Sequence, residues 1–215
     1  YFQVSLEGKK THNNAIRGDG NFEETMRFLQ LANAAGIATH VMLTLTPHNI
    51  HQVIPLARAL QGIAMRFAFN RLSRAGEAKD FQLPDKNAFI ALLHNYTREA
   101  KRLSVCGFKD NLFNVLRHHN KKPLFGGCTG AGCGAAFNFV AILPDGEVHA
   151  CRKFPSYLGN IFSQSLLAIY ASESAAQYRR GSSGCKGCSI KWVCGGCLAS
   201  TWSAGLDPLR DRDPY

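Results

Sequence analysis

The sequence lacks the features of a secreted or membrane-spanning protein. No apolar run approaches the roughly 18 residues that a membrane-spanning helix needs, and the opening run YFQVSL has neither a basic start nor a cleavage site. We therefore expect a cytoplasmic protein with no membrane partner. The 215 residues contain no internal repeat or low-complexity tract, and they are enough for one large domain or a domain plus a module.

Acidic residues are scarce relative to basic ones. There are 15 Asp and Glu against 25 Lys and Arg, which gives a net charge of +10. This balance is typical of nucleic-acid-binding proteins, but also of a basic surface that neutralises anionic partners, including thiolate-ligated clusters. No basic stripe with interleaved aromatic side chains is present, and we expect the run HHNKK at 118–122 to be a solvated loop. A nucleic-acid partner is therefore not favoured.

The eight cysteines are unevenly distributed. Without a secretion signal they argue against a disulfide framework. Cys106 stands apart, and we expect it to be a buried, inert thiol. The other seven form two sets, Cys128, Cys133 and Cys151, followed by Cys185, Cys188, Cys194 and Cys197. Because glycine is also dense in this last part, we place a module boundary near residues 104–125.

The stretch CKGCSIKWVCGGC, from 185 to 197, predicts a metal site. Two CxxC pairs are a common zinc site, but zinc sites usually separate the pairs by about a dozen residues or more. Here five residues separate Cys188 from Cys194. The earlier set supplies only three ligands, and shared use of one cysteine run by two clusters is familiar from iron–sulfur proteins. Iron–sulfur clusters are favoured. The alternative is a non-catalytic zinc scaffold with a basic nucleic-acid-binding face.

The first hundred residues predict three consecutive β-then-α units. The strands are YFQVSL, IATHVMLTL and IAMRFAFNRL, and the helices begin near Asn21, Asn49 and Asp85. We expect Asn21 to form a capping box with Glu24, Asn49 to cap its helix, and Pro55 to disturb the first turns of that helix. Three such units predict an α/β fold with a parallel sheet and right-handed crossovers.

The last ninety residues predict a small α+β module. Two strand-like runs, AFNFVAIL and EVHACRKF, flank Pro144-Asp145-Gly146 and predict a β-hairpin. A short amphipathic helix is expected at roughly 164–172, and a last helix at about 197–204.

The cysteine spacing resembles the SPASM module of radical SAM enzymes. Cys133, twelve residues, Gly146, four residues and Cys151 match its start, and CxxC, five residues and two further cysteines match its middle. Upstream, VSLEG, VMLTLTPHN and NRLSRAGEA resemble the fourth, fifth and sixth strands of radical SAM barrels. The resemblance implies the C-terminal half of a partial (β/α)6 barrel at 1–105, a linker at 106–127, and a SPASM iron–sulfur module at 128–215.

The resemblance also implies cofactors and their ligands. One auxiliary [4Fe–4S] cluster would use Cys128, Cys133, Cys151 and Cys197, and a second would use Cys185, Cys188 and Cys194 with a last cysteine. The sequence ends at Asp213-Pro214-Tyr215 without that cysteine, and CGGC stands where CGGGC is usual. S-adenosyl-L-methionine (SAM) would be contacted by Ser5, Glu7, Arg71 and Arg74, whereas Arg17 is expected in an exposed loop.

The implied activity is radical modification of a ribosomally made peptide or protein, supported by an electron donor such as flavodoxin or ferredoxin. The CxxxCxxC loop of the SAM-binding cluster is absent, so we expect a fragment that is inactive alone. No catalytic residue is assigned. Arg152 stands where sulfatase-modifying members have an aspartate base, so formylglycine formation is not expected. A finer resemblance is to maturases of cysteine- or selenocysteine-bearing peptides, including the thio(seleno)oxazole type. A SPASM enzyme acting on a small molecule is the alternative.

Overall fold

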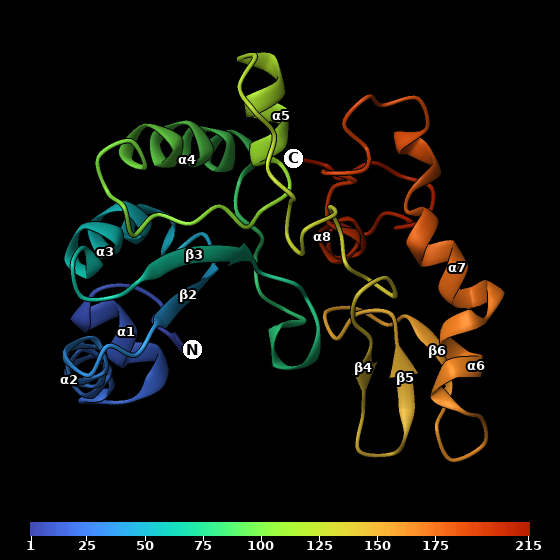
Figure 1. The fold of residues 1–215 in the computed structure, drawn as a ribbon, viewed down its shortest axis with the longest axis horizontal. Helices are drawn as coiled ribbons and strands as arrows, with labels where there is room; N and C mark the ends of the chain where they lie inside the picture. Colours follow the sequence, from blue (N-terminus) through green and yellow to red (C-terminus); the bar gives the residue numbers. More distant parts are fainter. The chain divides into compact units, whose positions relative to one another are not determined.

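The computed structural model describes all residues from 1 to 215, and these form two compact units (Figure 1). The first unit comprises residues 1–72, 82–109 and 215, and the second comprises 73–81 and 110–214. This division differs from the expected one in that the loop 73–81 belongs with the cysteine-rich part. No helix has the length and apolar character needed to cross a membrane.

The first unit is built on a three-stranded parallel sheet in the order β1-β2-β3. The strands are β1 (Phe2–Ser5), β2 (Thr39–Leu45) and β3 (Arg66–Arg71), with Val4 opposite Val41 and Val41 opposite Phe67. The central strand is buried along most of its length, as expected for a parallel sheet covered on both faces. The predicted parallel sheet is therefore present.

Helices follow each strand of this unit (Figure 1). They are α1 (Lys10–Arg17), α2 (Asn21–Ala34), α3 (Val53–Leu60) and α4 (Lys86–Glu99), with a short 3₁₀ turn η1 (Ile50–Gln52) before α3. Helix α1 was not predicted, because KTHNNAIR carries too few apolar residues to show helical spacing. Pro55 occupies the third position of α3, and the preceding turn is 3₁₀, in agreement with the expected disturbance.

Both predicted helix caps are wrong, and the two asparagines have other partners. The N-cap residue of α2 is Gly20, which has a left-handed backbone conformation with a φ of +79°. The Asn21 side chain instead accepts a hydrogen bond from Asn13 Nδ2 at 2.9 Å. Asn49 makes no side-chain cap; it accepts from the Thr46 N–H and donates to the carbonyls of Glu7 and Thr44. Asp85 does cap α4, accepting from the Ala88 N–H at 2.9 Å.

The start of the expected linker lies against the sheet of the first unit. The Phe67 N–H donates to Val105, and the Gly107 N–H donates back to Phe67, each at 2.7 Å. The Tyr96 hydroxyl also donates to the Phe67 carbonyl at 2.8 Å. Cys106 lies half-buried in the segment 105–107 that is bonded to β3, and burial raises the pKa of its thiol. Residues 105–107 are therefore part of the sheet edge rather than a free linker.

The second unit contains a three-stranded antiparallel sheet and several short helices (Figure 1). The strands are β4 (Ala141–Ile142), β5 (Glu147–His149) and β6 (Tyr157–Asn160), so the hairpin predicted at 144–146 is present. The helices are α5 (Phe113–His119), α6 (Leu166–Ala171), α7 (Glu173–Arg180) and α8 (Leu198–Ser203), with 3₁₀ turns η2 (Gly76–Ala78) and η3 (Ser183–Cys185). One helix was predicted near 164–172; a second, α7, follows it after Ser172.

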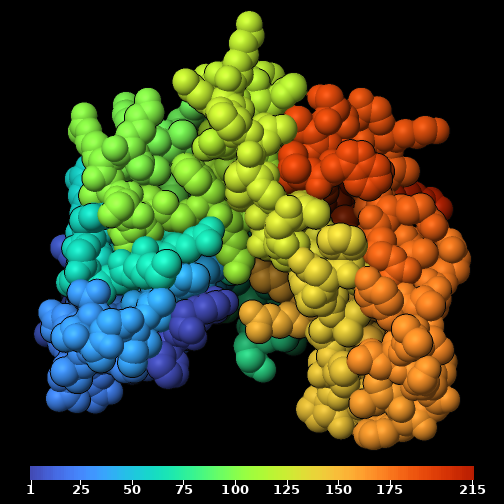
Figure 2. Space-filling view, in the orientation of Figure 1, coloured from blue at the N-terminus to red at the C-terminus, as the bar shows by residue number.

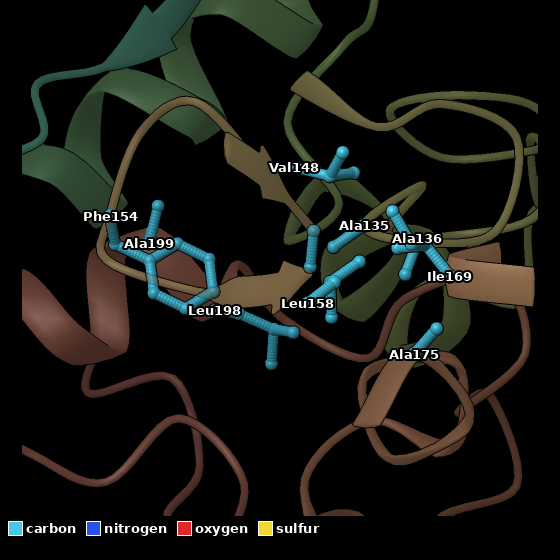
Figure 3. Packing of buried hydrophobic residues seen from close by; sticks show 10 residues of the cluster. Ala135, Ala136, Val148, Phe154, Leu158, Ile169, Ala175, Leu198 and Ala199 are labelled. Carbon is cyan, nitrogen blue, oxygen red and sulfur yellow. The ribbon is translucent and has the colours of Figure 1, made fainter. Parts of the chain in front are cut away.

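The core of the second unit joins the hairpin to the helices that follow it. Figure 3 shows Phe154 beside Leu198 and Ala199 of α8, and Ile169 of α6 near Ala136. In Figure 2 the yellow surface that leads into the hairpin lies against the orange surface of α6 and α7. The Tyr170 hydroxyl donates to the Phe137 carbonyl at 2.7 Å across this contact. This small core supports the cysteines described next.

Candidate metal centre

Three cysteines from distant parts of the second unit pack against this one core. Cys133 precedes the hairpin, Cys151 follows β5, and Cys197 precedes α8. Burial, together with the Cys197 and Cys151 thiols, raises the pKa of Cys133 to about 12. Burial and Cys197 likewise raise the pKa of Cys151. Because all three side chains pack against the same core, the fold gathers these thiols in one part of the second unit.

A second group is formed by Cys185, Cys188 and Cys194. Burial and the neighbouring Cys188 thiol raise the pKa of Cys185. Burial raises the pKa of Cys194 to about 11, with Asp213, Asp110 and Cys185 adding to the effect. The Cys188 N–H donates to the Cys185 carbonyl at 3.1 Å, which folds this CxxC pair into a turn. Six of the seven candidate ligands are thus sorted into two neighbourhoods.

Two buried asparagines at the start of α5 hold the cysteine loops. Asn111 accepts from the Cys128 N–H and donates to the Gly196 carbonyl, both at 2.6 Å. Asn114 donates to the Val193 carbonyl at 2.7 Å. Its Nδ2 also donates to the Phe125 carbonyl, and its Oδ1 accepts from the Phe125 N–H. Cys128 itself is exposed. The two side chains therefore connect the segment around Cys128 with the segment from Cys194 to Cys197.

Sequence reasoning missed these asparagines. Their spacing in DNLFN, three residues apart among apolar residues, was the available signal, since it places two amides on one side of a turn. It did not reveal their partners, because the bonded carbonyls lie 79 and 85 residues away along the chain.

The Asp213 carboxylate holds the backbone at Cys197. Its Oδ2 accepts a hydrogen bond from the Cys197 N–H at 2.8 Å. The same carboxylate raises the pKa of Cys185 and of Cys194, which places it between the two groups of thiols. The chain end therefore fixes the backbone just before α8.

The donor set fits a thiolate-ligated metal group. All seven candidate ligands are cysteines, which suit iron–sulfur clusters and zinc and not oxygen-preferring cations. Three thiols gathered on an apolar core cannot all ionise cheaply without a nearby cation, and the raised pKa of Cys133 expresses that cost. No group of three or more His, Cys, Asp or Glu side chains is already drawn together to metal-binding geometry.

The four residues expected to contact SAM are placed in different ways. Ser5 ends β1, Glu7 follows it, and Arg71 ends β3, so these three lie at the carboxyl edge of the parallel sheet. Arg74 belongs to the loop 73–81 of the second unit, where its Nε donates to the Phe81 carbonyl at 2.8 Å.

Glu7 and Arg71 are both held in fixed positions. Glu7 is buried; its carboxylate accepts from Arg17 Nε at 3.2 Å and from the Thr44 N–H at 3.0 Å. Arg17 is exposed as expected, but it ends α1 instead of lying in a loop, and it forms this ion pair. The Arg71 guanidinium lies 5.1 Å from the Phe89 ring centre and 5.0 Å from that of Tyr215. Such cation–π contacts fix a cationic group where a partly buried charge needs support.

Residues 133–189 match the SPASM family, which is described as an iron–sulfur cluster-binding domain. This segment is similar to SPASM domains. The match confirms the iron–sulfur cofactor that the sequence implies. Cys133, Cys151, Cys185 and Cys188 fall inside the matched residues, whereas Cys128, Cys194 and Cys197 fall outside them.

Comparison with curated proteins extends the relationship beyond the SPASM domain. The chain is 29% identical over 206 residues to the antilisterial bacteriocin subtilosin biosynthesis protein AlbA of Bacillus subtilis (strain 168), covering 90% of this chain and 44% of that protein. It is 28% identical over 228 residues to the mycofactocin maturase MftC of Mycobacterium tuberculosis (strain CDC 1551 / Oshkosh), covering 99% and 56%. The predicted relationship to SPASM-type radical SAM peptide maturases is confirmed. The chain spans about half the length of these relatives.

Solved structures show the same fold. Streptococcus suis SuiB matches with a TM-score of 0.66 at 18% identity, covering 99% of this chain and 53% of that one. SuiB bound to S-adenosylmethionine matches with a TM-score of 0.65, also at 18% identity, covering 99% and 52%. The α/β fold of this chain is therefore similar to that of SuiB.

Proposed function

We propose that this chain is the C-terminal portion of a SPASM-type radical SAM enzyme that modifies a ribosomally made peptide or protein. The observation that carries the proposal is the SPASM match over residues 133–189, together with the packing of Cys133, Cys151 and Cys197 against one core. One auxiliary [4Fe–4S] cluster would use Cys128, Cys133, Cys151 and Cys197, and the other Cys185, Cys188 and Cys194 with a further ligand. The relatives' names, a bacteriocin biosynthesis protein and a mycofactocin maturase, support a peptide substrate.

The first unit would supply part of the SAM site. Bound SAM would provide, in the whole protein, the 5′-deoxyadenosyl radical that takes a hydrogen atom from the substrate. The carboxyl edge of a parallel sheet is where barrel enzymes collect their active-site residues, and Ser5, Glu7 and Arg71 lie there. Because Glu7 is occupied by Arg17 and Thr44, we assign it a positioning role at this edge. SuiB, which has the same fold, has been solved with S-adenosylmethionine bound, and this supports SAM as the cofactor.

The second unit would handle electrons and orient the substrate. Its clusters would accept an electron from the substrate radical or hold a substrate thiolate, and a flavodoxin or ferredoxin would supply electrons for SAM cleavage. Arg152, directly after the ligand Cys151, cannot act as a carboxylate base. The reaction therefore does not follow the formylglycine route, and the substrates we expect are peptides that the relatives' class of maturase would modify.

The deciding experiment measures iron, sulfide and zinc in the full chain after anaerobic reconstitution, with a Mössbauer spectrum. We expect about eight iron atoms per chain in two cubane clusters. Cys151→Ser and Cys188→Ser should each remove about half of the iron, since each change belongs to a different cluster. Cys106→Ser is the matched control, because Cys106 lies in the sheet edge of the first unit. Zinc without iron would instead support the non-catalytic scaffold.

A further inference from the structure

A groove of about 540 Å³ lies within the second unit, next to Cys151. One wall is the loop 73–81, the other is formed by β5 and the turn after it, and Trp202 of α8 also lines the groove. We call it the Arg152 groove, and its principal lining residues are Arg74, Lys79, His149, Cys151, Arg152 and Trp202. The proposed ligand Cys151 thus faces a space large enough for several side chains.

The two walls of this groove are held in place by hydrogen bonds. The Ser73 hydroxyl donates to the Lys153 carbonyl, and the Arg74 N–H donates to Ser203 Oγ at 3.0 Å. Ser203 Oγ in turn donates to the Ala199 carbonyl of α8 at 2.7 Å. The loop 73–81 is therefore fixed both to the segment after Cys151 and to α8. A groove whose walls are already ordered loses little conformational entropy when a ligand enters.

The charges that line the groove are mostly positive. Arg74, Lys79 and Arg152 contribute three cations, against the single carboxylate of Glu147. That carboxylate is already engaged, since Glu147 Oε2 lies 3.0 Å from His149 Nε2. Glu77 and Asp80 lie on the same loop but do not line the groove. Lys79 and Arg152 are exposed, so their charges are available at the entrance.

The groove also has an apolar part. Leu143, Phe154 and Trp202 line it, and Phe154 also belongs to the core cluster with Leu198 and Ala199, beside which it lies in Figure 3. A ligand suited to it combines carboxylates with an apolar side chain, as an acidic peptide segment does. Nucleic acid fits less well, because its backbone needs a longer run of cations and exposed aromatic rings for stacking.

We infer that the Arg152 groove binds an acidic segment of a peptide, with carboxylates against Arg152 and Lys79 and an apolar side chain toward Trp202. This inference rests on the proposed function, because it names the chemistry of the peptide that such an enzyme would take. It places that segment beside Cys151. The positive lining makes it a specificity element, since a basic peptide would meet repulsion there.

The test measures binding of fluorescein-labelled peptides to the reconstituted full chain by fluorescence anisotropy under anaerobic conditions. The probes are a nonapeptide with three glutamates around a leucine and a matched peptide with glutamines. We expect the glutamate peptide to bind at least about tenfold more tightly, and Arg152→Glu or Lys79→Glu to weaken it by about three- to tenfold each, as for charge pairs at an interface. Lys122→Glu makes the same charge change on an exposed residue outside the groove, and should alter binding less than about twofold.

Three results would overturn the inference. The first is equally tight binding of the glutamine peptide. The second is an equal loss of binding in the Lys122→Glu control, which would assign the effect to the net charge of +10. The third is displacement of the labelled peptide by a single-stranded oligonucleotide at a lower concentration than by the unlabelled acidic peptide. Iron is measured on the same samples. If the iron content is as expected but Arg152→Glu does not change peptide binding, peptide binding in the groove is rejected and the proposed function stands. If the chain takes up only zinc but still binds the acidic peptide selectively, the proposed function is rejected and peptide binding in the groove stands.

Discussion

At the scale of single residues, the site depends on side chains that carry no chemistry of their own. Asn111 and Asn114 are buried, and every hydrogen bond described for them ends on the backbone of a cysteine-bearing loop. An amide suits this task because it donates and accepts at once and stays neutral at any pH. The cysteines could be chosen as candidate ligands from their spacing alone, since ligation of a shared cluster would impose such a spacing. The asparagines could not, because their partner carbonyls are distant in sequence.

Replacing Asn114 by alanine should destabilise the second unit. The change leaves the Val193 and Phe125 carbonyls and the Phe125 N–H without this partner, and buried unsatisfied groups cost about 1–3 kcal/mol each when water cannot reach them. We expect a loss of about 2–3 kcal/mol in urea unfolding, together with reduced iron uptake. Asn120→Ala is the control, because that side chain is exposed and bonds only within its own helix. Equal losses in the two variants would contradict the role given to Asn114.

At the scale of secondary-structure elements, the sequence predicted what local pattern determines. The three parallel strands, the hairpin around Gly146 and the helix after Asp85 follow from apolar runs and turn residues, and all are present. Helices α1 and α5 were missed because each is short and lacks a sustained apolar stripe. The cap at Asn21 was wrong because Gly20 takes the left-handed backbone conformation, which frees the asparagine for a tertiary bond.

The hairpin turn gives a test at this scale, through Gly146→Ala. Gly146 has a φ of +83°, and a Cβ there would meet the Phe162 ring at 2.6 Å and Asn160 Oδ1 at 2.7 Å. We expect destabilisation of about 2–4 kcal/mol, the sum of the positive-φ cost and overpacking. Gly205→Ala is matched in backbone conformation, with a φ of +78°, but faces open space. It should cost about 1 kcal/mol in the same thermal or urea unfolding experiment. Similar costs at both positions would show that the Phe162 contact is unimportant.

At the scale of the whole molecule, metal binding should protect the two units unequally. A group that binds only the folded second unit stabilises that unit by mass action and leaves the first unaffected. Hydrogen–deuterium exchange should therefore slow across 128–151 and 185–203 on reconstitution, and remain unchanged in β2 and β3. The matched control is the Cys151→Ser, Cys188→Ser double variant treated in the same way. Uniform protection of both units would show that they unfold as one.

The path of the chain has a consequence for inheritance and engineering. The polypeptide passes between the two units four times, at 72/73, 81/82, 109/110 and 214/215. A recombination event that joined a foreign C-terminal half at residue 110 would bring the cysteines but leave behind the loop that forms one wall of their neighbouring groove. The segment 73–81 and the module beyond it should therefore be inherited together, and a functional chimera of two relatives would have to exchange both pieces at once.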